Sequence, residues 1–346
     1  MNRSPAIRGW KPEKPKRSSG LMLAAALCAA AMVAMSLTAL RPREDAAALP
    51  QAMAAEEPAA RPALPENIVT ALPPGATRRL TITNQRLLQG RMLLVDEEHP
   101  IPEGVQLEDV FGVLTYARGR IACRDQQAAL GRETLAALED MCVHARNSGM
   151  SFITVFAGCR SREQQRLLLL EKVGDLSRSM TMEEAVAEAK RFVPPPGCSE
   201  HQLTRSVDIR ICLGWNLPPR AEPLTDSPQG TWVVEHAWEY GFIQRWPEAD
   251  PALDDHRPYC FRYVGRTHAM LMHALDMTME EYLALLRERG AVTLLDENGA
   301  PLATAMCAEA GERHTVFEAP EDVMLDDASL DNTGWAVISF TYPSRG

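Results

Sequence analysis

The chain has 346 residues, 46% of them hydrophobic and 24% charged, and its formal net charge is −10. That length is sufficient for one well-buried globular domain with additional segments. The charge is uneven, because residues 1–20 hold six basic side chains and one acidic side chain, so the rest of the chain carries −15. An acidic body without a basic, aromatic-rich patch argues against nucleic acid as a partner.

The N-terminal segments predict export. Residues 1–20 form a basic leader, and the twenty residues from Leu21 to Leu40 contain no charged side chain. A helix of that length, rising about 1.5 Å per residue, crosses a hydrocarbon core of about 30 Å. Because basic residues precede it, we expect a cytoplasmic leader, a single-pass anchor in the cell membrane and an extracytoplasmic main domain. A cleaved signal peptide, which would release a secreted protein, is the alternative.

Residues 41–77 are rich in alanine and proline and show no sustained apolar period, which predicts a semi-extended linker. A folded domain is expected over residues 78–290, and we expect it to fold without the preceding segments. Its first elements are a strand over Met92–Val95 and a helix over Glu133–Ala145, whose leucines recur at helical spacing.

A strand over Phe152–Ala157 precedes two helices between residues 161 and 193. Ser161 can cap the first helix, and Thr181 with Glu184 forms a capping box for the second. The run 167–170 contains only leucine, so we expect the first helix to be buried on more than one side.

The stretch 197–210 has the strongest chemical pattern. Residues 206–211 alternate between polar and aliphatic side chains, which predicts a strand that buries the aliphatic residues and turns Asp208 to the opposite face. His201 lies on the preceding loop, where its imidazole could share a cation with that carboxylate. A surface histidine beside a solvated aspartate is the alternative interpretation.

Further elements follow in the second half of the chain. A helix over Trp232–Tyr240 ends at Gly241, and strands are expected over Phe242–Trp246 and Cys260–Val264, with a capped helix ending near Gly290. Residues 291–346 contain short strand signals separated by turns, which predict a small β-rich C-terminal appendage without a catalytic constellation.

Eight cysteines occur, and one of them lies in the apolar segment 21–40. The remaining seven are an odd number, so an exported chain would keep at least one thiol unless two chains pair through it. Cys198 and Cys212 bracket the His201 and Asp208 segment, and a disulfide between them would clamp it. Buried free thiols are the alternative.

Several short motifs occur in the order of a known family. They are Gly-Cys-Arg-Ser at 158–161, Ser-Glu-His-Gln at 199–202, Val-Asp-Ile at 207–209, Tyr-Gly-Phe-Ile at 240–243 and Phe-Arg-Tyr-Val-Gly at 261–265. The set resembles the VanY-type zinc D-alanyl-D-alanine carboxypeptidases. The resemblance implies an α+β fold, with an antiparallel-sheet zinc D,D-peptidase-like domain flanked by helices, acting on peptidoglycan stem peptides that end in D-Ala-D-Ala.

The resemblance also implies site residues. In the family-like arrangement, His201, Asp208 and Cys260 would be the Zn²⁺ ligands, with thiolate an accepted zinc ligand. The residues that match substrate-binding positions are Arg160 and Ser199, which would hold the terminal carboxylate, and Gln164, a neighbouring polar contact.

One motif departs from the family. Where the family has Glu-Pro-Trp-His, this chain has Arg-Pro-Tyr-Cys at 257–260, so the general base and the third histidine ligand are both replaced. Arg257 cannot accept a proton, but it could stabilise an oxyanion or the substrate carboxylate. His256 is the nearest replacement base.

Three functions are therefore open. The first is a zinc D,D-carboxypeptidase of the cell wall, and the second is a catalytically degenerate member that binds wall peptides without cleaving them. The third is a cysteine hydrolase with Cys260 as nucleophile and His201 or His256 as base.

Overall fold

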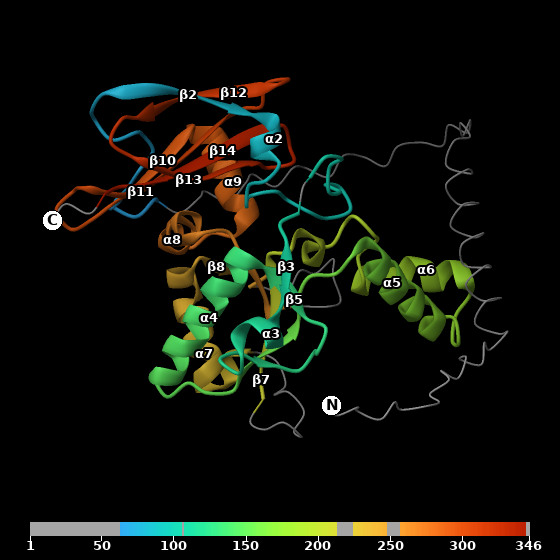
Figure 1. Cartoon of the computed structure of the whole chain (residues 1–346). Helices are drawn as coiled ribbons and strands as arrows, with labels where there is room; N and C mark the ends of the chain where they lie inside the picture. The colour runs from blue at the N-terminus through green and yellow to red at the C-terminus, as the bar shows by residue number, and fades with distance from the viewer. Residues whose placement is uncertain (1–62, 106, 213–223, 248–256, 344–346) are drawn as a thin grey trace, which may run out of the picture. The chain divides into compact units, whose positions relative to one another are not determined.

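The computed structural model describes residues 63–343 except 106, 213–223 and 248–256. The basic leader, the apolar segment 21–40, most of the Ala/Pro-rich linker and His256 therefore lie outside the described residues. Within the described ranges, no helix combines the length and the apolar character needed to cross a membrane. This part of the chain mixes helices with largely antiparallel sheets, which confirms the α+β prediction (Figure 1).

The sheet that carries the candidate site has five strands. In spatial order they are β4 (Ala122–Cys123), β6 (Ile153–Ala157), β7 (Ser206–Ile211), β9 (Cys260–Tyr263) and β8 (Phe242–Gln244). Only β4 and β6 pair in parallel; the other neighbours in this sheet are antiparallel. The predicted alternation on β7 is confirmed, because Val207, Ile209 and Ile211 are buried in the core while Asp208 is turned to the other face.

Helices cover the core face of this sheet. They are α4 (Arg132–Asn147), α7 (Pro228–His236) and the 3-10 helix η3 (Ala237–Tyr240). Leu135, Leu138 and Met141 of α4 pack with the aliphatic residues of β7 in one apolar cluster. Smaller elements complete this part of the fold: β3 (Val110–Gly112), α3 (Val113–Ala117), β5 (Ala129–Gly131), η1 (Glu200–Leu203) and η2 (Leu224–Asp226). The short helix α2 (Asn84–Leu87) instead packs into the apolar cluster of the other sheet.

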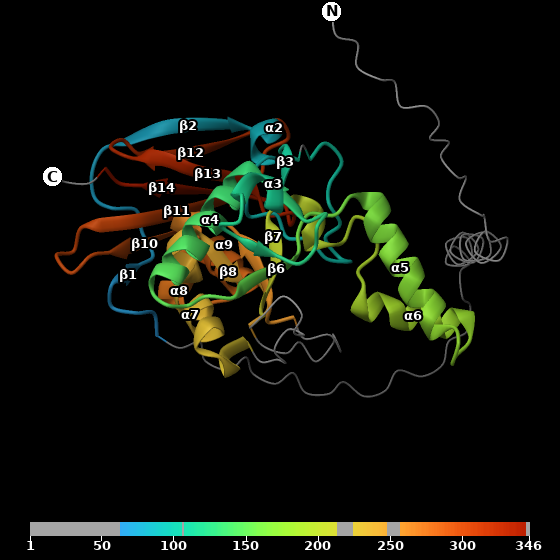
Figure 2. The same cartoon turned by 60° about the horizontal axis from the view of Figure 1, so that its bottom comes forward.

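Helices α5 (Arg162–Leu176) and α6 (Met182–Phe192) form a hairpin that projects beside this body in both views (Figures 1 and 2). Both predicted caps are confirmed, since Ser161 and Thr181 each form a complete capping box. The prediction that α5 is buried on more than one side is wrong. Leu167 is 52% exposed and only Leu169 of the leucine run is fully buried, because the helix is covered on one face only.

A second sheet has the order β1 (Ile68–Val69), β10 (Ala291–Leu295), β11 (Pro301–Glu309), β14 (Trp335–Thr341) and β13 (Met324–Leu330). Next to it, β2 (Thr77–Thr83) pairs with β12 (His314–Pro320) over seven residue pairs. Helices α8 (Arg266–Leu275) and α9 (Met279–Arg289) share one apolar cluster with β10, β11 and β14.

The expected boundaries at residues 78 and 291 therefore do not separate independent units, and the described residues from 63 onward form one compact unit. Strands from before and within residues 78–290 pair with strands of the supposed appendage. The strand predicted over Met92–Val95 is also wrong. That run is a buried irregular segment. Two of its backbone N–H groups donate to Ser329 Oγ at 2.9 Å and to Asp331 O at 3.2 Å, rather than to a neighbouring strand.

Candidate metal centre and active site

Three potential metal donors converge at the polar face of the first sheet. His201 lies on η1, Asp208 on β7 and Cys260 on β9, and one donor atom from each lies within 4.8 Å of the other two. Asp208 and Cys260 are directly paired across the antiparallel strands, so their side chains share one face. His201 Nε2 lies 3.2 Å from Asp208 Oδ1.

The histidine is held by its other nitrogen. His201 Nδ1 lies 2.8 Å from the carbonyl oxygen of Gly158, which can only accept a hydrogen bond. We therefore assign a proton to Nδ1, which makes Nε2, the nitrogen that faces Asp208, the one that could bind a metal ion. Gly158 is needed at this turn, because a Cβ there would lie 2.5 Å from the backbone oxygen of Ala129.

The electrostatics of the two remaining donors differ. Burial alone would raise the pKa of Asp208, but His201 and Arg160 outweigh burial and the pKa of that carboxyl is lowered. Burial raises the pKa of the Cys260 thiol well above its ordinary value, and the Asp208 charge raises it further, while Arg257 opposes this only in part. Cys260 is fully buried, so without a cation it is a protonated thiol.

The donor set fits zinc. Imidazole nitrogen, carboxylate oxygen and thiolate sulfur are its usual ligands, and bonds of about 2.0–2.3 Å in a tetrahedron place donors roughly 3.3–3.7 Å apart. The Asp208 Oδ1 atom is buried without a hydrogen-bond partner in the described part of the chain, which suits an oxygen reserved for a cation. Three protein donors leave a fourth position for a water or a substrate, as in catalytic zinc sites.

The predicted substrate-binding residues are only partly brought together. Arg160 extends toward the donors, with Nη2 4.0 Å from Asp208 Oδ2, and its Nη1 donates to Gln165 Oε1 at 3.3 Å. Ser199 is buried immediately before η1. Gln164 instead uses its side-chain oxygen in the cap of α5, accepting from Ser161 N at 2.7 Å. The glutamine that contacts Arg160 is therefore Gln165, not Gln164.

Gln165 was missed by the sequence reasoning, although a signal existed. A glutamine three residues after a capping serine is expected to fold back on the cap, which leaves the next residue to face inward. Gln165 is fully buried and its Nε2 donates to Pro194 O at 2.8 Å, so it connects Arg160 to the segment that follows α6.

Arg257 is engaged elsewhere. Its Nη2 donates to the backbone oxygen of Phe192, the last residue of α6, and its guanidinium lies 5.9 Å from the centre of the Trp246 ring. A cation at the C-terminal end of a helix satisfies an orphan carbonyl and complements the helix dipole. This contact places Arg257 between β9 and the α5–α6 hairpin. His256, the suggested replacement base, lies outside the described residues.

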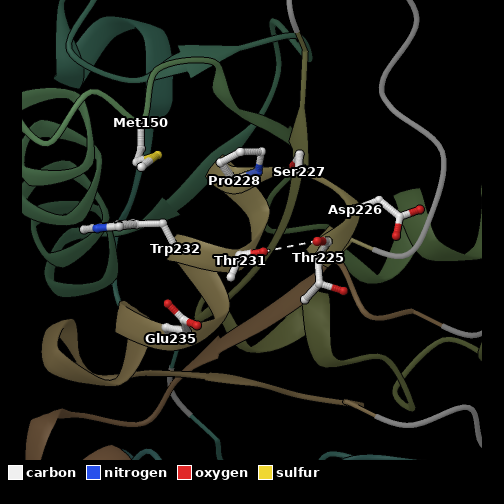
Figure 3. Close-up of a pocket in the computed structure, with 8 residues that line it drawn as sticks. All are labelled: Met150, Thr225, Asp226, Ser227, Pro228, Thr231, Trp232 and Glu235. Atoms are coloured by element: carbon white, nitrogen blue, oxygen red, sulfur yellow. Dashed lines mark hydrogen bonds between the residues drawn. The ribbon is translucent and has the colours of Figure 1, made fainter.

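A separate cavity of about 440 Å³ lies between η2 and α7 (Figure 3). Met150 and Trp232 form its apolar wall, Asp226 and Glu235 supply carboxylates, and the Thr231 hydroxyl donates to Thr225 O at 3.1 Å. No residue of the donor cluster lines this cavity, so it is distinct from the candidate metal centre.

The seven cysteines of the described residues are all free. The suggested clamp between Cys198 and Cys212 is therefore not formed. Cys212 lies beyond the end of β7, with its backbone N–H bonded to Phe152 O at 3.0 Å.

Comparisons with known proteins agree with this geometry. Residues 127–266 match the family model described as VanY: D-alanyl-D-alanine carboxypeptidase. A D-alanyl-D-alanine carboxypeptidase of Enterococcus faecium is 26% identical over 222 residues, covering 63% of this chain and 65% of that protein. One of Enterococcus faecalis is 32% identical over 151 residues, covering 42% and 52%. The chain thus spans less than two thirds of the length of these two relatives.

A solved structure has the same fold. The vancomycin-resistance D,D-dipeptidase VanXYg, in complex with a D-Ala-D-Ala phosphinate analog, matches with a TM-score of 0.59 at 19% identity. The match covers 77% of this chain and all of that chain. The region matched by the family model includes all three donor residues. Over residues 127–266, this chain is similar to the VanY D-alanyl-D-alanine carboxypeptidase family.

Proposed function

We propose that the protein is a zinc-dependent D-alanyl-D-alanine carboxypeptidase that acts on peptidoglycan stem peptides. The observation that carries the proposal is the convergence of His201, Asp208 and Cys260 within the VanY-family region. The ion would be held by Asp208, by Cys260 and by the Nε2 atom of His201, which is directed toward Asp208. When bound, zinc supplies a Lewis acid that polarises a carbonyl and acidifies water.

Binding of the substrate would rest on Arg160. Its guanidinium lies at the edge of the donor cluster, where a planar fork suits the terminal carboxylate of a peptide. Gln165 accepts from one arm of that fork, which leaves the other arm directed toward the cluster. The buried Ser199 lies next to η1 and would contribute the second polar contact to the same carboxylate.

The general base of the family has no equivalent at Arg257, because a guanidinium does not accept protons and its contact with Phe192 directs it to the end of α6. General base catalysis contributes roughly 10²- to 10⁴-fold, so we expect slow hydrolysis. His256 remains the nearest alternative base in sequence. The cysteine-hydrolase alternative is disfavoured, because Cys260 is fully buried and its pKa is raised, whereas a nucleophilic cysteine needs access and a lowered pKa.

We also propose that the N-terminal segments direct the protein out of the cytoplasm. The basic residues before the uncharged stretch Leu21–Leu40 support a single-pass anchor, with release after signal cleavage as the alternative. A peptidoglycan substrate requires this placement. Protease accessibility of the domain in intact spheroplasts would test it.

The proposed activity is tested by elemental analysis of the full chain, purified in mild detergent and reducing buffer, together with D-alanine release from a stem pentapeptide. We expect one zinc per chain and slow release of D-alanine that His201→Ala abolishes. Zinc binding with saturable peptide binding and no release would instead make the protein a wall-peptide binder. Absence of zinc from both the protein as purified and the zinc-supplemented protein would overturn the metal-dependent assignment.

A further inference from the structure

Glu200, the residue next to His201, is a buried carboxylate that the proposed chemistry does not use. It is 2% exposed, although glutamate is seldom buried without a partner. Successive side chains on a 3-10 helix such as η1 point about 120° apart, so Glu200 and His201 diverge from neighbouring positions. Glu200 therefore contacts a different part of the sheet from the donor cluster.

Both carboxylate oxygens of Glu200 are occupied. Oε1 accepts from Arg245 Nε at 2.9 Å, while Oε2 accepts from Ser206 Oγ at 3.1 Å and from Arg262 Nη1. The three partners come from β7, β9 and the residue that follows β8. One side chain of η1 is thus bonded to three segments of the five-stranded sheet.

The position of these partners in the sheet is specific. Ser206 on β7 is directly paired with Arg262 on β9, and the next pair on the same face is Asp208 with Cys260. Glu200 is hydrogen-bonded to the Ser206–Arg262 pair, and His201 lies next to the Asp208–Cys260 pair. The distance from η1 to the Asp208–Cys260 pair is therefore fixed by the contact that Glu200 makes one step along the sheet.

The charges of this network balance. Glu200 and Glu280 face Arg245 and Arg262, and Arg262 also donates to the backbone oxygens of Arg91 and Leu93 at 2.8 and 3.3 Å. Two guanidinium groups contact the carboxyl oxygens of Glu200, which is the environment of a carboxylate. Buried ion pairs often add little net stability, whereas they do fix geometry, which favours a placement role here.

We propose that Glu200 is a positioning residue for the metal centre: it locks η1 onto the Ser206–Arg262 pair so that His201 Nε2 meets Asp208 and Cys260. The inference rests on the proposed metal site. Replacing Glu200 by glutamine keeps the shape but turns one oxygen into an N–H donor, which faces a guanidinium group in either orientation of the amide and so loosens η1. Groups that orient metal ligands from behind typically change metal affinity by about 10- to 100-fold.

The experiment measures Zn²⁺ affinity by chelator competition and the visible absorption spectrum of the Co²⁺-loaded protein. Glu200→Gln is expected to lower zinc affinity by about 10- to 100-fold and to alter the cobalt spectrum. The matched control is Glu280→Gln, which removes the other carboxylate on Arg245 but does not touch η1; its side chain is 50% exposed. This control is expected to keep the wild-type affinity and spectrum, even where its thermal midpoint falls.

Glu200→Asp provides a second test, because it keeps the charge and shortens the side chain. It is expected to fold and still alter the cobalt spectrum. Wild-type affinity and spectrum in Glu200→Gln, or equal losses in Glu280→Gln, would overturn the positioning role while leaving the proposed function intact. Failure of both Glu200 variants to fold would also overturn it, since the residue would then be required by the fold. A wild-type protein that binds neither ion would overturn both proposals.

Discussion

Asp208 and Cys260 face each other as a direct pair across β7 and β9, although 52 positions separate them in the sequence. A directly opposed pair places two side chains on one face with their Cβ atoms about 4.5–5.5 Å apart. Only the third donor, His201, comes from outside the sheet, on the 3-10 helix η1. The metal centre is therefore built mainly by strand register, and changes that alter the β7–β9 register are expected to remove it.

Arg160 is expected to bind the terminal carboxylate of the substrate. Arg160→Ala should weaken binding of a D-Ala-D-Ala peptide by roughly 1.5 to 3 kcal/mol, the range for hydrogen bonds to a charged group. Calorimetry on the zinc-loaded protein measures this. Arg166→Ala is the matched control, because Arg166 lies on α5 and is paired with Glu163 on the surface. Equal affinity of the wild type for a C-terminally amidated peptide would contradict the assignment.

The C-terminal strands are expected to be essential for folding. Leu271 and Tyr282 of the two helices before Gly290 pack in one apolar cluster with Val292, Ala305 and Val337 beyond it. A chain ending at Gly290 exposes this cluster and leaves β1 and β2 unpaired, so it should be unfolded or aggregated. Circular dichroism and size-exclusion chromatography of residues 63–290 and 63–346 check this. A monomeric, cooperatively melting short fragment would restore the boundary expected from the sequence.

His268 is expected to make stability depend on pH. Burial is the main cause that lowers the pKa of His268, and it outweighs the opposing charges of Asp327 and Asp326. The Nδ1 atom of His268 lies 3.0 Å from the hydroxyl oxygen of Tyr282. The unfolded chain then binds a proton more readily than the folded chain below about pH 6.5. This contribution to stability is present above that pH and is lost as pH falls toward the lowered folded pKa.

His268→Gln should therefore flatten the fall in thermal midpoint between about pH 6.5 and 5, even where it lowers stability at neutral pH. His314→Gln is the control, since His314 is exposed on β12. Differential scanning calorimetry across this range distinguishes the two variants. Parallel pH profiles for wild type and His268→Gln would show that another group governs acid destabilisation.

Local signals predicted part of the fold well. The caps at Ser161, Thr181 and Thr278 form as predicted because a capping box is a motif of only four consecutive residues. The convergence of the donors was predicted through the family resemblance, and alternation on β7 and β9 accounts only for the faces on which Asp208 and Cys260 lie. What could not be predicted is pairing at long range: β2 meets β12 more than 200 residues later, and no local pattern specifies that partner.

Two strands and one side-chain role were missed for similar reasons. Strand β11 begins with Pro301, and β13 contains Asp326 and Asp327, so neither resembles an alternating apolar strand. The role of Arg257 depends on Phe192, 65 residues earlier, which reaches it only when the α5–α6 hairpin is in place. The family resemblance predicts that Arg257 stands at the position of the family's base, but no local pattern indicates what Arg257 contacts.

The altered motif itself provides the sharpest test of activity. Restoring the family pattern with Arg257→Glu and Cys260→His supplies a carboxylate base and a second imidazole, and should raise D-alanine release by about 10²-fold or more. The change also removes the contact with Phe192 and places a negative charge near the C-terminus of α6, which should cost on the order of 1 kcal/mol of stability. Activity is therefore compared well below the thermal midpoint of each variant.

The matched control is the double variant Arg257→Gln and Cys260→His. It loses the same guanidinium contact and gains the same imidazole, but it lacks a base. If the rate of D-alanine release rises only in the glutamate variant, the gain comes from proton transfer. It would then follow that His201, Asp208 and Arg160 are already arranged for hydrolysis. An equal increase in both variants would assign the gain to the ligand exchange. If the glutamate variant binds one zinc yet releases no D-alanine, the carboxypeptidase proposal should be abandoned, because the remaining cleft would not support the reaction even with its base restored.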